Sequence, residues 1–233
     1  MIRRILNRIT DNSAFLAAGK AADTLALNVL NDIDIDIGFI PWTRAAMRPS
    51  TILHILNEIF INDRRSIIEF GAGVSTIYLA WAAKQVGANV ISIEENGSWA
   101  SKIKTHVGDI GAGDVCDVRA IGRKPLKGQG YDSHWYDAGQ VKDLIGGLKF
   151  DVVVVDGPTA FEAGQEQARR PAIDVLSGNL AENYAIFLDD ALRPGEQQAL
   201  AAWEASLGVK ASLETINGGH AFLGHGQRFF SGL

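Results

Sequence analysis

The spacing of hydrophobic residues changes repeatedly along the chain, between short continuous runs and a helical repeat. Short runs rich in Ile, Val and Phe, each bounded by polar residues or glycine, predict strands. These strands are expected at residues 65–70, 89–95, 114–121, 149–157 and 184–190. Between and before them, hydrophobic residues recur every three or four positions, which predicts amphipathic helices. These helices are expected at residues 51–60, 74–87, 98–108, 165–180 and 194–208.

The regular alternation of strands and helices predicts a parallel sheet with helices on both faces. Right-handed crossovers then make the fold doubly wound. Residues 152–155 are consecutive valines, as expected for a strand that is covered on both faces. Residues 209–216 and 220–226 predict two further strands, joined at Asn217, Gly218 and Gly219 as a hairpin. The predicted fold class is therefore α/β, with a doubly wound, seven-stranded, mainly parallel sheet and a C-terminal antiparallel hairpin.

The start of the chain does not follow this alternation. Residues 13–30 have a helical repeat, and residues 31–40 (NDIDIDIGFI) alternate acid and isoleucine, which predicts a short strand or an extended edge. We therefore expect an N-terminal helical extension over residues 1–48, ahead of an α/β domain over residues 49–233. The basic start MIRRILNRIT leaves two hypotheses open: a cap that packs on the domain or on a second copy, and a helix that lies on a membrane surface. Acidic residues after Thr10 favour the cap, and no run reaches the ~20 apolar residues of a membrane span.

Composition narrows the class of protein without identifying a function. The chain has 233 residues, a formal net charge of −5 and 47% hydrophobic residues, which is typical of an ordinary globular domain. The negative charge argues against nucleic acid as the main partner. A single cysteine, Cys116, excludes an intrachain disulfide and fits a reducing compartment, so we expect a cytoplasmic location.

Candidate chemistry lies where the predicted strands end. In open α/β sheets, ligands bind outside the carboxyl ends of the strands. Gly71 and Gly73 follow the first strand, where they allow a tight turn and a close approach of a ligand to the backbone. The free N–H groups of the following helix favour an anionic group. Glu94 ends the second strand about 20 residues later, where an acid can accept hydrogen bonds from a ribose; a purely structural bend is the alternative.

Two features of the glycine turn separate the candidate cofactors. A dinucleotide fingerprint has a third glycine, and here the turn continues with Ser75 and Thr76 in place of that glycine. Glu69 places a carboxylate beside the turn, where it would repel a pyrophosphate and suit a ligand with an ammonium group. The alternative is that Glu69 caps a helix or pairs with a basic side chain. The turn therefore favours a nucleoside cofactor that carries an ammonium group over a dinucleotide.

The segments IIEFGAGVSTIYLA, ISIEENGSWA and VVVVDGP together resemble the class I S-adenosylmethionine-dependent methyltransferases, which have a Rossmann-like fold. The resemblance extends roughly from Met47 to the C-terminus. It implies that Glu69, Gly71, Gly73 and Ser75 surround the methionine end of S-adenosylmethionine and that Glu94 holds the ribose. It also implies that Asp156, after the fourth strand, lies at the cofactor.

A second resemblance concerns the acids after the fourth and fifth strands. Asp156, Asp189 and Asp190 are similar in arrangement to the metal site of catechol-type O-methyltransferases, and Pro194 and Gly195 follow at the matching distance. The resemblance implies that the three acids bind Mg²⁺, which suits oxygen ligands and lowers the pKa of an acceptor hydroxyl.

Departures from that pattern leave a metal-free site open. Thr159 stands where those enzymes carry a lysine base. Asp156 itself or a histidine such as His134 is then the candidate base, and His134 lies in a stretch, residues 121–140, that we expect to be a long surface loop covering the acceptor. Arg169 and Arg170 are expected to pair with the acids, to bind an anionic acceptor or to lie on a solvated helix face.

The sequence thus predicts a methyltransferase that uses S-adenosylmethionine, with or without Mg²⁺, and acts on a hydroxyl group of a small molecule or sugar. Two alternatives remain, an NAD(P)-dependent oxidoreductase and a non-catalytic nucleoside-binding domain. Association into a homo-oligomer through the N-terminal segment is a further expectation.

Overall fold

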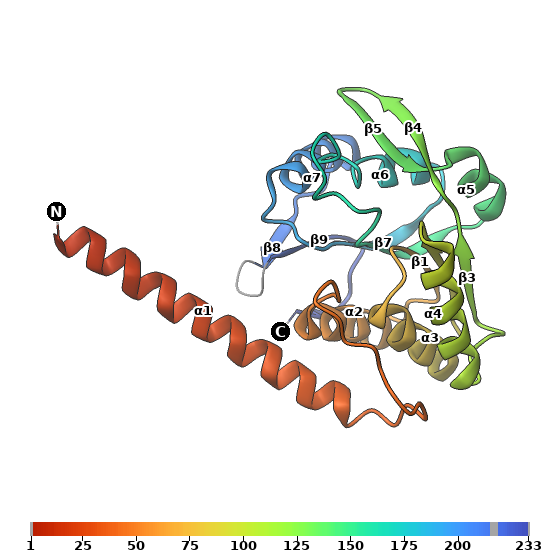
Figure 1. Ribbon diagram of the computed structural model, residues 1–233, viewed down its shortest axis with the longest axis horizontal. Coiled ribbons are helices and arrows are strands. Elements are labelled where there is room, and N and C mark those ends of the chain that lie inside the picture. The colour runs from red at the N-terminus through yellow and green to blue at the C-terminus, as the bar shows by residue number, and fades with distance from the viewer. Residues whose placement is uncertain (1, 215–218, 233) are drawn as a thin grey trace.

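A seven-stranded sheet runs through the middle of the molecule in the computed structural model, which describes residues 2–214 and 219–232 (Figure 1). The strands follow the order β3-β2-β1-β6-β7-β9-β8 across the sheet. Pairing is parallel from β3 to β7, and β9 runs antiparallel to both of its neighbours. The strands are β1 (Ser66–Phe70), β2 (Asn89–Glu94), β3 (Cys116–Ala120), β6 (Phe150–Val155), β7 (Leu180–Leu188), β8 (Ser212–Glu214) and β9 (His220–His225).

Helices cover both faces of this sheet. One face carries α2 (Pro49–Ile61), α3 (Val74–Val86) and α4 (Gly97–Asp109), as Figure 1 shows. The other face carries α5 (Ala138–Ile145), α6 (Pro171–Leu176) and α7 (Pro194–Leu207). The doubly wound α/β fold is thereby confirmed.

The core consists of two layers, one on each side of the sheet. Val152 and Val154 of β6 belong to the layer under α2, α3 and α4, whereas Val153 and Val155 belong to the layer under the other helices. All four valines are fully buried. Because successive residues of a strand point to opposite faces, a strand between two helical layers must be hydrophobic throughout, as the valine run predicted.

The expectation of a long loop at residues 121–140 is wrong. The segment forms an antiparallel hairpin of β4 (Arg123–Gly128) and β5 (Tyr131–Tyr136), followed by the start of α5. Trp135 and Tyr136, at the end of β5, are buried and pack against Phe70 of β1. Trp135 therefore belongs to the core, whereas the buried Tyr136 also borders the cavity at the strand ends.

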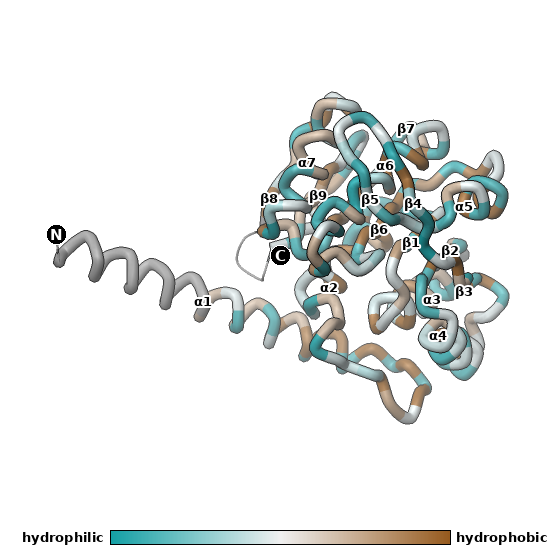
Figure 2. Tube along the Cα trace, turned by 45° about the horizontal axis from the view of Figure 1, so that its top comes forward, coloured by the Kyte–Doolittle hydropathy of each residue, from teal (hydrophilic) through white to brown (hydrophobic). Residues whose placement is uncertain are grey.

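The N-terminal segment is helical, as predicted, but its second part contains no strand. Helix α1 (Ile2–Asn31) packs on α2 through its C-terminal part, where Ala26 and Leu30 are buried, and its other end projects from the body (Figure 1). Residues 32–48 connect it to α2 without strand pairing, although acid and isoleucine alternate over residues 32–37. Figure 2 shows hydrophobic stretches along this connection. No helix in the described part of the chain is both long and apolar enough to cross a membrane.

Two further boundaries differ from expectation. The helix predicted at residues 165–180 is only the short α6, because residues 165–170 form turns, and α5 was not predicted. The C-terminal strands β8 and β9 pair as a hairpin, as predicted. The predicted turn residues Asn217 and Gly218 lie outside the described residues.

Candidate functional site

A cavity of about 1130 Å³ opens at the carboxyl ends of the parallel strands. Its wall is formed mainly by the segment before α2, the turns after β1 and β2, the loop after β6 and the turn after β7, with one residue from each strand of the β4-β5 hairpin. The lining includes Trp42, Arg44, Met47, Arg48, Gly71, Ala72, Gly73, Ser75, Glu94, Glu95, Asn96, Trp99, Arg123, Tyr136, Asp156, Gly157, Thr159, Phe161, Arg169, Asp189, Asp190 and Arg193. The structure therefore brings together most of the residues that the sequence selected.

The glycine turn is shaped by two different requirements. Gly71 has φ +99°, and a Cβ there would lie 2.7 Å from the backbone N of Gly157, so this position requires glycine. Gly73 is different, because a Cβ there would meet nothing within 4 Å. Gly73 therefore presents open backbone to the cavity, just before α3 begins at Val74. A ligand can approach both the turn and the first N–H groups of the helix.

Glu69 lies behind this turn and is not among the residues that line the cavity. Its side chain is fully buried. Ser75 Oγ donates a hydrogen bond to Glu69 Oε1 at 2.5 Å, and Thr76 Oγ1 and Ser92 Oγ each donate to Oε2 at 2.5 Å. Burial raises the pKa of Glu69 to about 7, although the three hydroxyl groups oppose this shift. The structure thus gives Glu69 hydroxyl partners, and direct contact with a ligand stays a prediction.

Glu94 lines the cavity at the end of β2. Backbone N–H groups of Ala72 and Asn96 donate to its two carboxylate oxygens, at 3.1 and 2.8 Å. Burial raises the pKa of Glu94, and these backbone bonds act in the opposite direction. Trp99 lies next to it and donates its Nε1 hydrogen to the carbonyl of Ala72 at 2.8 Å. The carboxylate is thus held at the cavity wall, with a half-buried aromatic ring beside it.

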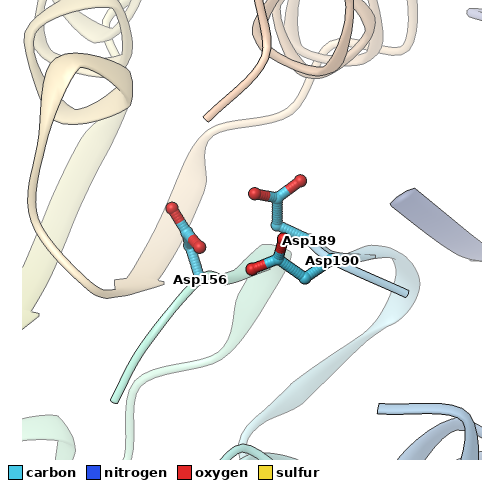
Figure 3. A group of neighbouring side chains, drawn as sticks. All are labelled: Asp156, Asp189 and Asp190. Carbon is cyan, nitrogen blue, oxygen red and sulfur yellow. The ribbon is translucent and has the colours of Figure 1, made fainter. Parts of the chain in front are cut away.

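Three acids meet at the ends of β6 and β7. Asp156, Asp189 and Asp190 each offer one carboxylate oxygen, and these oxygens lie within 4.8 Å of one another. Figure 3 shows the three side chains projecting from adjacent strand ends into the same space. Adjacent parallel strands place their last residues side by side, so the three acids lie as close together as the sequence predicted. Their roles as base or metal ligands stay predictions.

Arg169 enters this acid cluster from the loop that precedes α6. Its Nη2 donates to Asp156 Oδ1 at 3.1 Å, and its Nη1 donates to Asp190 Oδ2 at 3.2 Å and to the carbonyl of Asp189 at 3.0 Å. The Arg169 side chain is only 6% exposed. Arg170 is directed elsewhere: its guanidinium donates to the carbonyls of Gln129 and Gly130 in the hairpin turn. Of the two arginines, Arg169 alone pairs with the cluster.

Burial and mutual repulsion disfavour the charged forms of these acids. Burial raises the pKa of Asp156 well above its usual range, Asp189 adds to this rise, and Arg169 opposes it. Burial and the neighbouring Asp190 raise the pKa of Asp189 to about 6. Carboxyl groups with pKa values shifted by burial and by a specific charged neighbour are typical of functional sites.

The acid cluster also matches the ligand preference of Mg²⁺. All its donors are carboxylate oxygens, and the bonds to Arg169 use one oxygen of Asp156 and one of Asp190. The second oxygen of each carboxylate and the Asp189 side chain remain for a cation. The donor set therefore fits Mg²⁺, with Arg169 as a competing positive charge.

His134 does not join the other candidates. Its side chain is exposed on β5 and does not line the cavity. Its ring and backbone are within hydrogen-bond distance of the Gln165 side chain, 3.2 and 3.1 Å away. A role for His134 as a base stays a prediction without support from the geometry.

No sequence pattern had indicated two other residues of the cavity wall, Arg123 and Phe161. Arg123, from β4, forms ion pairs with Glu95 and Glu162 and donates to the carbonyl of Thr159. These contacts connect the hairpin to the loop after β6. Phe161 of that loop is 77% exposed although it borders the cavity. A lone arginine in a presumed loop has no distinctive spacing, so sequence patterns could not have found this connection.

Several solved structures share this architecture. A protein of Staphylococcus aureus, provisionally described as a caffeoyl-CoA O-methyltransferase, superposes with a TM-score of 0.61 at 14% identity, covering 87% of this chain and 97% of that one. An O-methyltransferase of Bacillus cereus in complex with SAH gives 0.55 at 17% identity, over 88% and 90% of the two chains. The O-methyltransferase TomG of Streptomyces achromogenes, in complex with SAM, gives 0.53 at 18% identity, over 88% of both chains.

Comparison by sequence gives no match: no protein-family model fits the chain, and no curated protein matches it. At these low identities, the structural likeness establishes the fold. The seven-stranded sheet of this chain therefore has the fold of the class I O-methyltransferases to which it was compared.

Proposed function

We propose that this protein is an S-adenosylmethionine-dependent methyltransferase that acts on a hydroxyl group of a small molecule or sugar. One observation carries the proposal. A single cavity is bordered by the glycine turn after β1, by Glu94 after β2, and by the acids after β6 and β7. Its volume of about 1130 Å³ is enough for a nucleoside cofactor together with a small acceptor.

The cofactor would lie across the ends of β1 and β2. Gly71 and Gly73 would approach its methionine end, next to Ser75 at the start of α3. Glu94 would accept hydrogen bonds from the ribose hydroxyl groups. Asp156, beyond Gly71, would lie close to the sulfonium. These assignments are supported by the open backbone at Gly73 and by the fixed carboxylate of Glu94.

The acceptor would lie over the acid cluster. We assign Asp156 as the general base: its carboxylate takes the proton of the acceptor hydroxyl while the oxygen attacks the methyl carbon. The new O–CH₃ bond forms as the S–CH₃ bond breaks, and S-adenosylhomocysteine is the leaving group. Asp156 lines the cavity, and only one of its carboxylate oxygens is bonded to Arg169, which supports this role.

A divalent cation is the second candidate for activating the acceptor. Asp156, Asp189 and Asp190 would hold Mg²⁺, which would lower the pKa of a bound hydroxyl group. The spacing of their oxygens supports this alternative. Activity that survives EDTA would exclude it, whereas loss with EDTA and recovery with Mg²⁺ would exclude the metal-free base.

Calorimetric titration tests the cofactor. We expect S-adenosylmethionine and S-adenosylhomocysteine to bind and NAD not to bind, and the reverse result would favour an oxidoreductase. Transfer of labelled methyl groups to a panel of small hydroxyl compounds and sugars then tests the reaction. Asp156→Ala should abolish transfer while cofactor binding persists; undiminished transfer would remove Asp156 from the mechanism. Binding without transfer to any acceptor would favour a non-catalytic nucleoside-binding domain.

The N-terminal segment has a supporting part in this proposal. Residues 41–48 border the cavity, so the segment 1–48 would act as a cap on the cofactor site. The exposed Leu25 and Val29 of α1 are consistent with association of two copies through this helix. A cytoplasmic location remains part of the proposal.

A further inference from the structure

We infer that Glu69 is a positioning residue: with the hydroxyl groups of Ser75, Thr76 and Ser92, it sets the shape of the glycine turn from behind, without touching the cofactor. The inference rests on the proposed function, since it concerns the same cofactor site. It assigns to Glu69 a different task from the ammonium contact that the sequence suggested.

The geometry around Glu69 leaves it little freedom to serve a ligand. Both oxygens of its carboxylate are occupied by hydroxyl donors at 2.5 Å, a distance typical of charge-assisted O–H···O⁻ bonds. The side chain is fully buried and lies outside the cavity lining. The described part of the chain contains no ion pair to Glu69. The three hydroxyl groups are therefore what stabilises its charge.

Thr76 connects this carboxylate to the turn itself. The backbone N–H of Gly73 donates to Thr76 Oγ1 at 2.9 Å, and Thr76 Oγ1 in turn donates to Glu69. Because the hydroxyl oxygen accepts from Gly73, its hydrogen points to the carboxylate. The chain Gly73–Thr76–Glu69 thus fixes the orientation of the peptide that opens onto the cavity. A change at Glu69 would release the peptide at Gly73.

Ser75 and Ser92 complete the arrangement from two other elements. Ser75 lies in the first turn of α3 and Ser92 lies in β2, the strand next to β1. Their bonds to Glu69 tie the helix start and the neighbouring strand to β1. Counted from Gly71, the third glycine of the dinucleotide fingerprint G-x-G-x-x-G falls at Thr76. The Thr76 hydroxyl therefore replaces close helix packing by a hydrogen bond to a buried acid.

Thr76 and Ser92 provide the decisive test, because neither lines the cavity. Thr76→Val and Ser92→Ala remove one hydroxyl each, and any effect on the cofactor must pass through the turn. We expect each to weaken binding of S-adenosylhomocysteine about tenfold, the effect of one lost hydrogen bond to a charged group. Thr76→Ser keeps the hydroxyl and should restore binding. Thr51→Val is the matched control, since it removes a buried hydroxyl that is bonded to His220 away from the cavity.

Calorimetry on each variant, with its urea midpoint, separates the outcomes. Weaker binding in Thr76→Val and Ser92→Ala with unchanged binding in Thr51→Val supports positioning. Binding within twofold of wild type in both, with a loss only in Glu69→Gln, would mean that Glu69 contacts the ligand and would overturn the inference. A loss that Thr51→Val shares would indicate general destabilisation and overturn it too. If wild-type protein fails to bind S-adenosylhomocysteine, the proposed function falls, and this inference falls with it.

Discussion

Replacing Arg169 with methionine should destabilise the folded protein by about 3 kcal/mol, because the change leaves the largely buried Asp156 without a cation and leaves Asp190 with only the more exposed Arg193. The Arg169 side chain is 6% exposed and donates to Asp156 at 3.1 Å and to Asp190 at 3.2 Å. It also donates to the carbonyl of Asp189 at 3.0 Å. Methionine keeps an unbranched side chain and removes the guanidinium group. The loss of unfolding free energy therefore reports mainly the interactions of the guanidinium and not the creation of a large cavity.

Urea unfolding followed by tryptophan fluorescence measures this loss. For a domain of this size, each kcal/mol lowers the Tm by about 2–4 °C, so thermal unfolding should shift by roughly 10 °C. Arg193→Met is the control, because Arg193 also contacts Asp190 but is 40% exposed. An exposed pair contributes about 1 kcal/mol or less.

The dependence on pH sharpens this prediction. Without Arg169, the pKa values of Asp156 and Asp189 rise further above their values in the unfolded chain, so these acids take up protons more readily. Protonation removes the uncompensated charge, and the cost of the substitution should shrink at about pH 5. Asp156→Asn in the Arg169→Met background should recover part of the loss at neutral pH. A loss below about 1 kcal/mol, or one equal to that of Arg193→Met, would refute the assignment of Arg169 as the cation of the cluster.

Three other predictions follow from the structure. Gly71→Ala should abolish cofactor binding and lower stability by about 2 kcal/mol or more, because its Cβ would lie 2.7 Å from backbone; binding near the wild-type level would contradict this. Burial lowers the pKa of His54 to about 4 and of His220 to about 3, so both stay neutral in the fold, and stability should fall as pH drops from about 6.5 towards 4. In a double His→Gln variant, the free energy of unfolding should fall less steeply between about pH 6.5 and 4. An unchanged slope would exclude these histidines as the cause of the acid sensitivity. Glu58→Gln should lower the free energy of unfolding in urea by about 3 kcal/mol, because its buried partner Arg64 would lose its counter-ion. A change within about 0.5 kcal/mol, the size of an ordinary surface effect, would contradict this.

Much of the fold followed from the sequence because its signals are local. The runs at β1, β2, β6 and β7 and the helices between them gave the element order, and right-handed crossovers leave few topologies for such an order. The hairpin of β4 and β5 was missed for a local reason as well. Its first strand, RKPLKG, is largely polar and exposed, so it lacks the hydrophobic alternation that marks a strand.

The strand or extended edge predicted at residues 31–40 was wrong for the opposite reason, because a strand-like pattern is present there without a strand. Alternation of acid and isoleucine resembles an edge strand, yet these residues pair with no strand in the described sheet. A strand forms only beside a neighbour that has free backbone N–H and C=O groups. In the described sheet such groups lie along the edge strands β3 and β8, and residues 31–40 pair with neither. Pairing is a property of the whole fold, so the local pattern could not decide it.

For the candidate site, the sequence by itself determined that the acids at the strand ends would share one cavity, although it also selected His134, which lies outside that cavity. Asp156, Asp189 and Glu94 end parallel strands, and strand ends of one sheet lie along one edge, so their proximity needed no knowledge of side-chain packing. Only the tertiary structure decided their partners. Arg169 reaches the acids from a loop, and Glu69 turns away from the cavity towards hydroxyl groups of α3 and β2. The direction of a side chain depends on the charges and hydrogen-bond partners that distant segments bring to it, and these exist only once the chain has folded.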